Sequence, residues 1–246
     1  MKPEEKKLLH GLIAAVFWLA VWQLVSMAVG SEVILPGPVG TVSALGRLIV
    51  TSDFWSAVLT SFIHIVTGFV CAVVAGILLA IGAASVKAAD ILVSPLMRLI
   101  KAVPVASFIV LLLLWINSGV LPAVISFLMV LPVIYINVLT GIKNADCKLL
   151  EMARVFGVSR IKKLKYVYIP SVKPHFMSAV SIGLGFCWKS GVAAEVIALS
   201  AGSIGRRLYD AKLYVMTDEL FAWTVVIVLL SALFEKAVMA VVKKLV

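Results

Sequence analysis

The segment that decides the fold lies at residues 143–174, KNADCKLLEMARVFGVSRIKKLKYVYIPSVKP, between two long apolar runs. Its roughly 30 residues are many more than a connection between adjacent helices needs. In its first half, apolar residues recur at helical spacing and predict a short helix whose apolar face is formed by Leu149, Leu150, Ala153 and Phe156. Gly157 then follows as a helix-ending residue that tolerates a positive φ. We therefore expect an amphipathic helix that can dock in a groove on another protein.

The chain as a whole is too apolar for a water-soluble globule. Of its 246 residues, 63% are hydrophobic and 14% are charged, with a mean hydropathy of +1.14. Soluble domains have about 45–50% apolar and about 25% charged residues. The sequence therefore predicts an all-α integral membrane protein with about six spans in one transmembrane domain, 1–246. The predicted spans are 10–29, 57–85, 91–116, 120–142, 174–200 and 219–241.

Two of these spans need a comment. The first apolar run, of about 19 residues, is longer than the 7–15 apolar residues of a signal peptide, so we expect a retained span. In the third span, Arg98 and Lys101 lie between Pro95 and Pro104. This pattern indicates that its first part lies at the cytoplasmic edge.

Basic residues predict the orientation. The net charge of +10 could suggest nucleic acid, but the chain has no basic patch interleaved with aromatic residues, so no nucleic-acid partner is expected. With six spans and both termini inside, 15 of the 22 lysines and arginines fall in cytoplasmic parts, Lys6 and Lys7 among them. The excess of positive charge inside therefore predicts cytoplasmic termini.

The spacing within the long loop resembles a known motif. Glu151-Met152-Ala153 is followed after three residues by Gly157, after nine more by Val167, and then by Ile169-Pro170. This is similar to the EAA motif of ATP-binding cassette importer permeases, with apolar replacements at Met152, Val167 and Ile169. In that family the loop forms a coupling helix that sits in a cleft of the ATPase subunit. The resemblance implies that coupling depends on Glu151, Ala153, Phe156, Gly157 and Pro170.

An interfacial helix on anionic lipid is the alternative for this loop. The run of Arg160, Lys162, Lys163 and Lys165 would favour it. Lipid binding, however, demands no fixed spacing of glutamate, glycine and proline. We therefore favour the contact with an ATPase.

The resemblance covers about residues 35–242 and indicates a branch of the family. Leu35-Pro36-Gly37-Pro38, Lys101-Ala102-Val103-Pro104 and Ala194-Glu195 are similar to permeases for nitrate, sulfonates, taurine and thiamine precursors. His64 and Lys101 stand where that branch commonly has arginine. These departures leave the choice among those solutes open.

The resemblance also implies a fold and a set of partners. We expect the type I importer permease fold in a bacterial or archaeal cell membrane, a second permease copy, two cytoplasmic ATP-binding subunits and an extracytoplasmic solute-binding protein. The sequence most similar to a phosphate-binding loop is Gly183 followed by Lys189-Ser190, but Trp188 stands where the loop needs its second glycine. This chain is therefore not expected to bind nucleotide, and ATP and Mg would bind to the separate ATPase. The chain has no zinc-protease or serine-hydrolase motif and is not expected to be an enzyme. Its scattered cysteines and histidines predict neither a disulfide nor a metal site.

Two charged residues interrupt the fifth predicted span. Lys189 and Glu195 are six residues apart and therefore do not share a helix face. Each should find a partner on another helix, with His64 as one candidate, or face the translocation pathway. The candidate pathway residues are therefore His64, Trp188, Lys189 and Glu195, although both charges could instead hold the bundle together. A rival function is a secondary transporter in which Glu195 carries the coupling ion.

Small residues recur at every fourth position of the second span. They are Gly68, Ala72, Gly76, Ala80 and Ala84. Such a stripe allows another helix to approach closely, either from a partner subunit or from the same bundle. We favour packing within the bundle.

Overall fold

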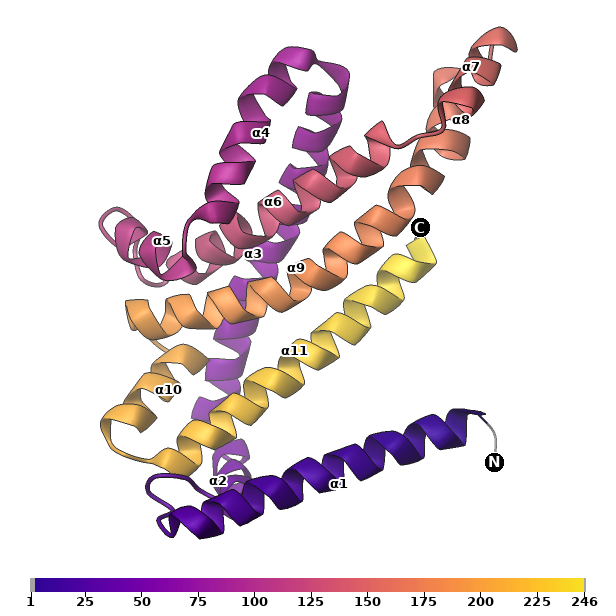
Figure 1. The fold of residues 1–246 in the computed structure, drawn as a ribbon. Coiled ribbons are helices and arrows are strands. Elements are labelled where there is room, and N and C mark those ends of the chain that lie inside the picture. Colours follow the sequence, from indigo (N-terminus) through magenta and orange to yellow (C-terminus); the bar gives the residue numbers. More distant parts are fainter. Residues whose placement is uncertain (1–2, 246) are drawn as a thin grey trace.

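The computed structural model describes the backbone of residues 3–245 and the side chains of residues 9–244, which form helices joined by turns (Figure 1). The side chains of Lys6 and Lys7, used above for the orientation, lie outside this range. The helices are α1 Pro3–Val29, α2 Pro38–Ile49, α3 Ser52–Ser85, α4 Lys87–Ala102, α5 Val105–Leu112, α6 Leu121–Lys143, α7 Cys147–Val155, α8 Arg160–Lys163, the π-helix η1 Leu164–Tyr168, α9 Ile169–Ala198, α10 Ile204–Leu213 and α11 Thr217–Leu245.

Five long helices in the described range are apolar enough to cross a membrane, and the pair α4 and α5 makes a sixth if it is counted as one bent span. The predicted fold class is therefore confirmed. The predicted third span, 91–116, is nevertheless wrong in form, because α4 and α5 meet at an angle of 101°. Pro104 has no N–H for the helix ladder and keeps Val103 extended, so the helix breaks at this pair.

The centre of the bundle consists of α3, α6 and α9, which pack along their lengths. Gly68 and Gly76 of α3 make this possible, because an added Cβ would meet the backbone oxygen of Ala123 at Gly68 and the side chain of Ile134 at Gly76. The predicted packing of the small-residue stripe within the bundle is confirmed for its first four members. Ala84, the last member, is exposed.

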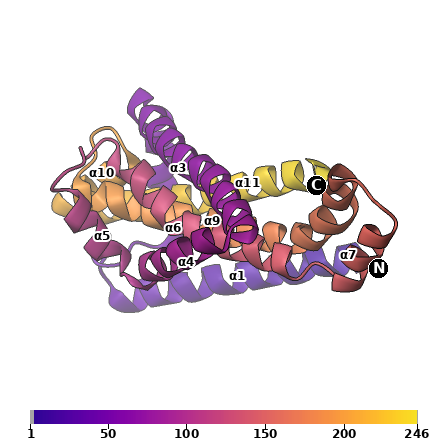
Figure 2. The same ribbon diagram turned by 90° about the horizontal axis from the view of Figure 1, so that it is seen from above.

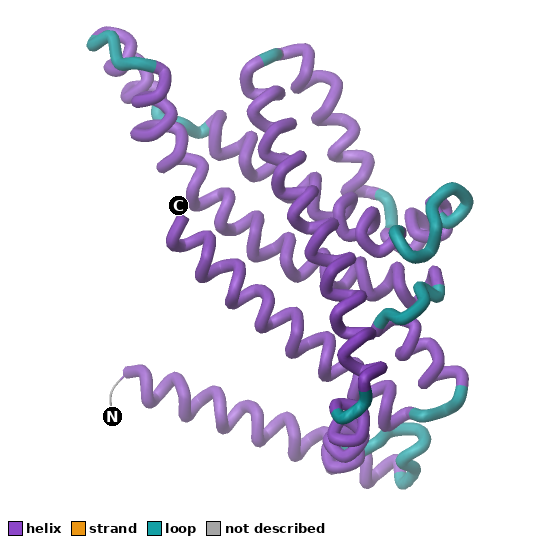
Figure 3. The backbone as a smooth tube through the Cα atoms, turned by 180° about the vertical axis from the view of Figure 1, so that it is seen from behind, coloured by secondary structure: helices purple, strands orange, loops and turns teal. Residues whose placement is uncertain are grey.

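Helix α1 stands apart from this centre (Figure 3). It is joined to the chain that follows it by hydrogen bonds from Trp22 Nε1 to the Pro36 oxygen, at 3.0 Å, and from Ser26 Oγ to the Leu35 oxygen, at 2.8 Å. The Trp22 ring also stacks on Phe221 of α11, with centroids 5.8 Å apart. Most of the apolar surface of α1 remains exposed, as expected for a helix surrounded by lipid.

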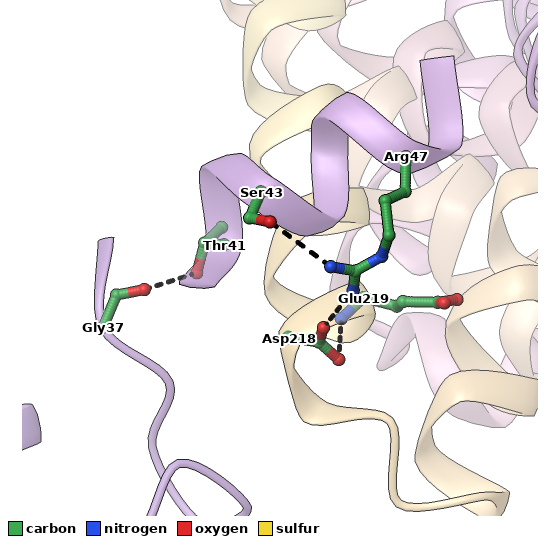
Figure 4. A network of polar contacts seen from close by, with 6 residues as sticks. All are labelled: Gly37, Thr41, Ser43, Arg47, Asp218 and Glu219. Carbon is green, nitrogen blue, oxygen red and sulfur yellow. Dashed lines mark hydrogen bonds and ion pairs between the residues drawn. The ribbon is translucent and has the colours of Figure 1, made fainter. Parts of the chain in front are cut away.

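The molecule has two distinct ends. The start of α1 and the end of α11 lie toward the end that carries α7, whereas α5 and α10 lie at the opposite end (Figures 1 and 2). We refer to them as the α7 end and the α10 end. At the α10 end, α2 is tied to the start of α11 by Arg47, which donates to Asp218 at 2.6 Å and to Ser43 at 3.3 Å (Figure 4).

The start of α4 lies at the α7 end, where Asp90 binds the Lys143 ammonium at 2.6 Å, at the end of α6. Lys101 lies at the other end of α4, about 16 Å further along the helix. Arg98 is one turn before it. The basic residues of α4 therefore lie in its second half, toward the break with α5.

Candidate functional site

The structure forms the predicted helix of the long loop as α7. The Asp146 carboxylate caps its start by accepting the Lys148 N–H at 2.8 Å. At its end, Gly157 has a φ of +60°, and the Val158 N–H donates to the Ala153 oxygen at 2.9 Å. This hydrogen-bonding pattern closes a helix on a left-handed residue, so the predicted role of Gly157 as the helix-ending residue is confirmed.

The apolar face of α7 is divided between the chain and its surroundings. Ala153 is buried, with 4% exposure, and points inward. Leu149, Met152 and Phe156 are exposed by 42%, 53% and 76%. We call these three side chains the α7 patch. Ala153, predicted to lie on the docking face, is therefore covered by the bundle, whereas Met152 is exposed. Helical spacing alone does not tell which side of the helix the bundle covers.

Other predicted coupling residues are also accessible. Glu151 is exposed and makes no ion pair with any described residue. A Cβ added at Gly157 would meet nothing within 4 Å, so only its backbone conformation restricts substitution there. The α7 and α8 region projects beyond the bundle in both views (Figures 1 and 2). The site is therefore a surface and not a cavity.

Pro170 connects this surface to the membrane helices. It lacks the N–H that a regular helix would use, and the preceding turn is a π-helix in which the Ile169 N–H donates to the Leu164 oxygen. The helical stretch continues through this position, and Arg160–Ala198 form one candidate span of 39 residues.

The four predicted pathway residues differ in their surroundings. Trp188 is buried between Phe62 of α3 and Phe234 of α11, with both ring centroids at 6.3 Å. Lys189, the next residue, is exposed. His64 is partly buried, and its Nδ1 has no hydrogen-bond partner among the described residues.

Glu195 is fully enclosed. Its Oε2 accepts a hydrogen bond from the Ser61 hydroxyl of α3 at 2.8 Å and another from the Gly205 N–H at the start of α10 at 2.9 Å. Ser61 in turn accepts the Ile204 N–H at 2.9 Å. The proposed pairing of Glu195 with His64 is therefore wrong.

Ser61 and Gly205 were not singled out as partners of Glu195. Ser61 is one small polar residue within an apolar run, and Gly205 is distant in the sequence. A Cβ at Gly205 would collide with the Cβ of Glu195 and approach the Val196 nitrogen to 2.7 Å. In the sequence, only the glycine at position 205 indicated that the backbone of α10 comes so close to that of α9.

Residues 72–246 match the family model described as "Binding-protein-dependent transport system inner membrane component". The chain is 33% identical to a putative aliphatic sulfonates transport permease protein SsuC of Escherichia coli, over 89% of this chain and 82% of that protein. It is 26% identical to the protein of the same description from Bacillus subtilis, over 99% of this chain and 90% of that protein. Its fold is similar to that in a crystal structure of an amino acid ABC transporter with histidines, with a TM-score of 0.62. The two sequences are 16% identical, and the match covers 82% of this chain and 96% of that chain.

Proposed function

The chain belongs to this family of inner membrane components, the permeases of ATP-binding cassette importers, and we propose that it binds a separate ATPase through the α7 patch. The observation that carries the proposal is the exposure of Leu149, Met152 and Phe156 on a helix that projects from the bundle. Three large apolar side chains on one helix face are suited to a groove on another protein. Glu151 adds a charge that lacks a partner in the described part of the chain.

The partners follow from the same proposal. ATP and Mg would be bound by two ATPase subunits, and a second permease copy would supply the second docking helix by twofold symmetry. The solute would arrive on an extracytoplasmic binding protein. The α7 end would face the cytoplasm together with both chain termini, in agreement with the charge bias of the sequence.

The solute that we propose is a small molecule of the sulfonate, taurine or nitrate kind, with a thiamine precursor as the alternative. The sulfonate permeases from two bacteria support the first choice. An ion-driven secondary transporter is not favoured by family membership. The enclosure of Glu195, which that mechanism would use for its coupling ion, also argues against it.

The α7 patch can be tested by replacing Phe156 with serine. A hydrophobic anchor at a protein interface contributes about 1–3 kcal/mol, so the permease should lose roughly tenfold to a hundredfold in affinity for its ATPase. The readout is the amount of ATPase that remains bound to the purified permease, together with ATP-driven uptake by proteoliposomes.

Val39 offers the matched control, because it is as exposed as Phe156 but lies on α2 at the opposite end. Val39→Ser should leave ATPase binding unchanged. Equal binding by the wild type and Phe156→Ser would overturn the docking role of the patch.

A further inference from the structure

A long apolar groove lies between three spanning helices at the α7 end. It has a volume of about 670 Å³, and its apolar lining comes from α3, α6 and α9, with Ile77, Ile81, Val138, Ile142, Val172 and Phe176 along its length. Leu164 of η1 lines it nearest to the α7 end. The helix rises about 18 Å from Leu164 to Phe176, so the groove follows the direction of the spans.

The helices that form the groove are held at fixed positions by close contacts. An added Cβ at Gly141 of α6 would lie 2.8 Å from the Val172 Cα of α9, and the Ser171 hydroxyl donates to the Gly141 oxygen at 2.8 Å. Gly76 of α3 comes equally close to Ile134 of α6. Helix α6 is therefore packed tightly against both α3 and α9, and the groove is a fixed feature of the bundle.

The described chain leaves the lining of the groove open to its surroundings. Ile81, Leu164 and Ile169 all line it and are each about half exposed. The Ser85 hydroxyl, also in the lining, already donates to the Ile81 oxygen at 2.8 Å. The groove therefore offers mainly apolar contacts, and an apolar chain that covered it would be stabilised by the surface it removes from water.

Four basic residues lie at the end of this groove, within about 6 Å of Leu164 along the helix axis. We call them the basic run, which consists of Arg160, Lys162, Lys163 and Lys165. Among the described residues, no carboxylate forms an ion pair with any of them. The Lys165 ammonium lies 5.5 Å from the centroid of the Tyr166 ring. A basic cluster directly beside the end of a spanning helix attracts anionic lipid.

The groove and the basic run together identify the occupant. A helix from a second copy of the chain would cover the apolar lining but would leave the four positive charges without counterions. A free phosphate ion would neutralise charge but would leave the lining uncovered. An amphiphile with an anionic head and an apolar chain matches both features.

We propose that an anionic phospholipid occupies this site, with an acyl chain in the groove and its phosphate against the basic run. Leu164 and Tyr168 line the groove and belong to η1, which directly follows α8, so the bound lipid would support the base of the projecting loop. The α7 patch lies on a different helix and stays free for the ATPase. The assignment does not rest on the proposed function, because it requires only that α3, α6 and α9 span a membrane.

Lipid selectivity of the purified full chain tests the proposal. Native mass spectrometry in detergent measures the dissociation constants of dioleoylphosphatidylglycerol, which is anionic, and of dioleoylphosphatidylcholine, which has no net charge. Each basic residue beside an anionic head group contributes about a factor of five, so phosphatidylglycerol should bind at least about tenfold more tightly. Added inorganic phosphate should not displace it. Displacement by phosphate, or equal binding of the two lipids, would overturn the proposal.

A charge variant tests the basic run. Lys162→Gln combined with Lys165→Gln should weaken the binding of phosphatidylglycerol roughly tenfold or more and leave that of phosphatidylcholine unchanged. The matched control is Lys212→Gln combined with Lys236→Gln, which removes the same charge from two exposed lysines outside the groove. Unchanged selectivity in the first variant would overturn the proposal. Loss of the ATPase with lipid binding intact would assign the basic run to a protein interface and would overturn it as well.

An obstructing variant tests the groove. Ala84 lines it from an exposed position of α3, so Ala84→Trp places a ring in the space for the acyl chain and should weaken phosphatidylglycerol roughly tenfold or more. Ala84→Leu obstructs the same place with a smaller side chain and repeats the test if the tryptophan variant does not fold. Ala88→Trp, at an exposed position of α4 outside the groove, is the control. Unchanged lipid binding in the Ala84 variants, with or without dissociation of a permease dimer, would overturn the proposal.

Discussion

Helices α7 and α10 are built alike at opposite ends of the molecule. Each begins at a side-chain cap, Asp146 for α7 and Ser203 for α10. Each ends on a residue with positive φ, Gly157 at +60° and Val215 at +58°. In both cases the N–H of the next residue donates to a carbonyl five residues back, so the local designs are nearly the same.

The two helices differ in what holds their starts. The start of α10 is fixed by Ser61 and Glu195, and Arg207 forms an ion pair with Asp53 of α3 at 2.8 Å. Among the described residues, none gives α7 a comparable polar connection to a membrane helix, and its apolar patch is exposed. The difference teaches that the start of α10 is fixed by its own chain, whereas α7 projects with the surface that we propose for a partner.

The largest expected effect concerns the anchor of α10. Glu195→Leu would remove the acceptor of two buried donors, the Gly205 N–H and the Ser61 hydroxyl. This loss should lower the free energy of unfolding by about 2–4 kcal/mol. Unfolding of the detergent-purified chain measures this cost. Glu195→Gln keeps an acceptor oxygen and should retain most of the stability. If the leucine variant were as stable as the wild type, α10 would not depend on this carboxylate.

Glycine substitutions test the two helices as a matched pair. Gly205→Ala forces a collision with Glu195 and the Val196 backbone and should destabilise the chain by about 1–3 kcal/mol. Gly157→Ala enters open space and should cost only about 1 kcal/mol, the lower end of the strain of an L-residue at positive φ. The same unfolding measurement compares both variants. A Gly157→Ala variant less stable than Gly205→Ala would reverse the contrast between a packed helix and a projecting one.

A bulkier residue at Gly157 separates stability from coupling. Gly157→Val imposes about 1–2 kcal/mol of backbone strain, which is confined to the end of α7 because nothing packs there. We expect normal membrane insertion, weaker retention of the ATPase and reduced ATP-driven uptake. Unchanged uptake with a fully coupled ATPase would remove Gly157 from the coupling machinery.

The smallest effect is expected at the equivalent position of α10. Val215 is β-branched and has a φ of +58°, a conformation that valine disfavours and that glycine adopts readily. Val215→Gly should relieve that strain but increase the entropy of the unfolded chain, for a net stabilisation of about 0.5 kcal/mol. Thermal unfolding of the two proteins checks this difference. A clear loss of stability would mean that the valine side chain makes contacts worth more than its strain.

Local patterns were sufficient to predict much of the fold. The lengths of the apolar runs predicted the spans, and the positions of glycine and of apolar residues predicted α7 and its end. The sequence did not predict the sharp bend at Val103 and Pro104. A proline within an apolar run is compatible with either a kinked helix or a broken one. Its angle depends on where α5 can pack.

The candidate site was predictable only in part. The spacing from Glu151 to Pro170 located the loop that projects from the bundle, but the identity of its exposed residues depended on the position of the bundle. Lys189 and Glu195 were recognised as unusual from their charge alone. Their different surroundings, one exposed and one enclosed, could not be derived from a spacing of six residues, which only excludes a shared face.

Residue types and spacings along one helix were enough to predict the apolar spans, the loop helix that ends at Gly157 and the positions of the charges. They did not predict that Ala153 turns inward while Phe156 stays exposed, or that Glu195 joins Ser61 to the start of α10. Burial and hydrogen-bond partners are set by contacts between distant segments, which no local pattern contains. The helical repeat fixes which residues share a face, and packing decides what each face meets.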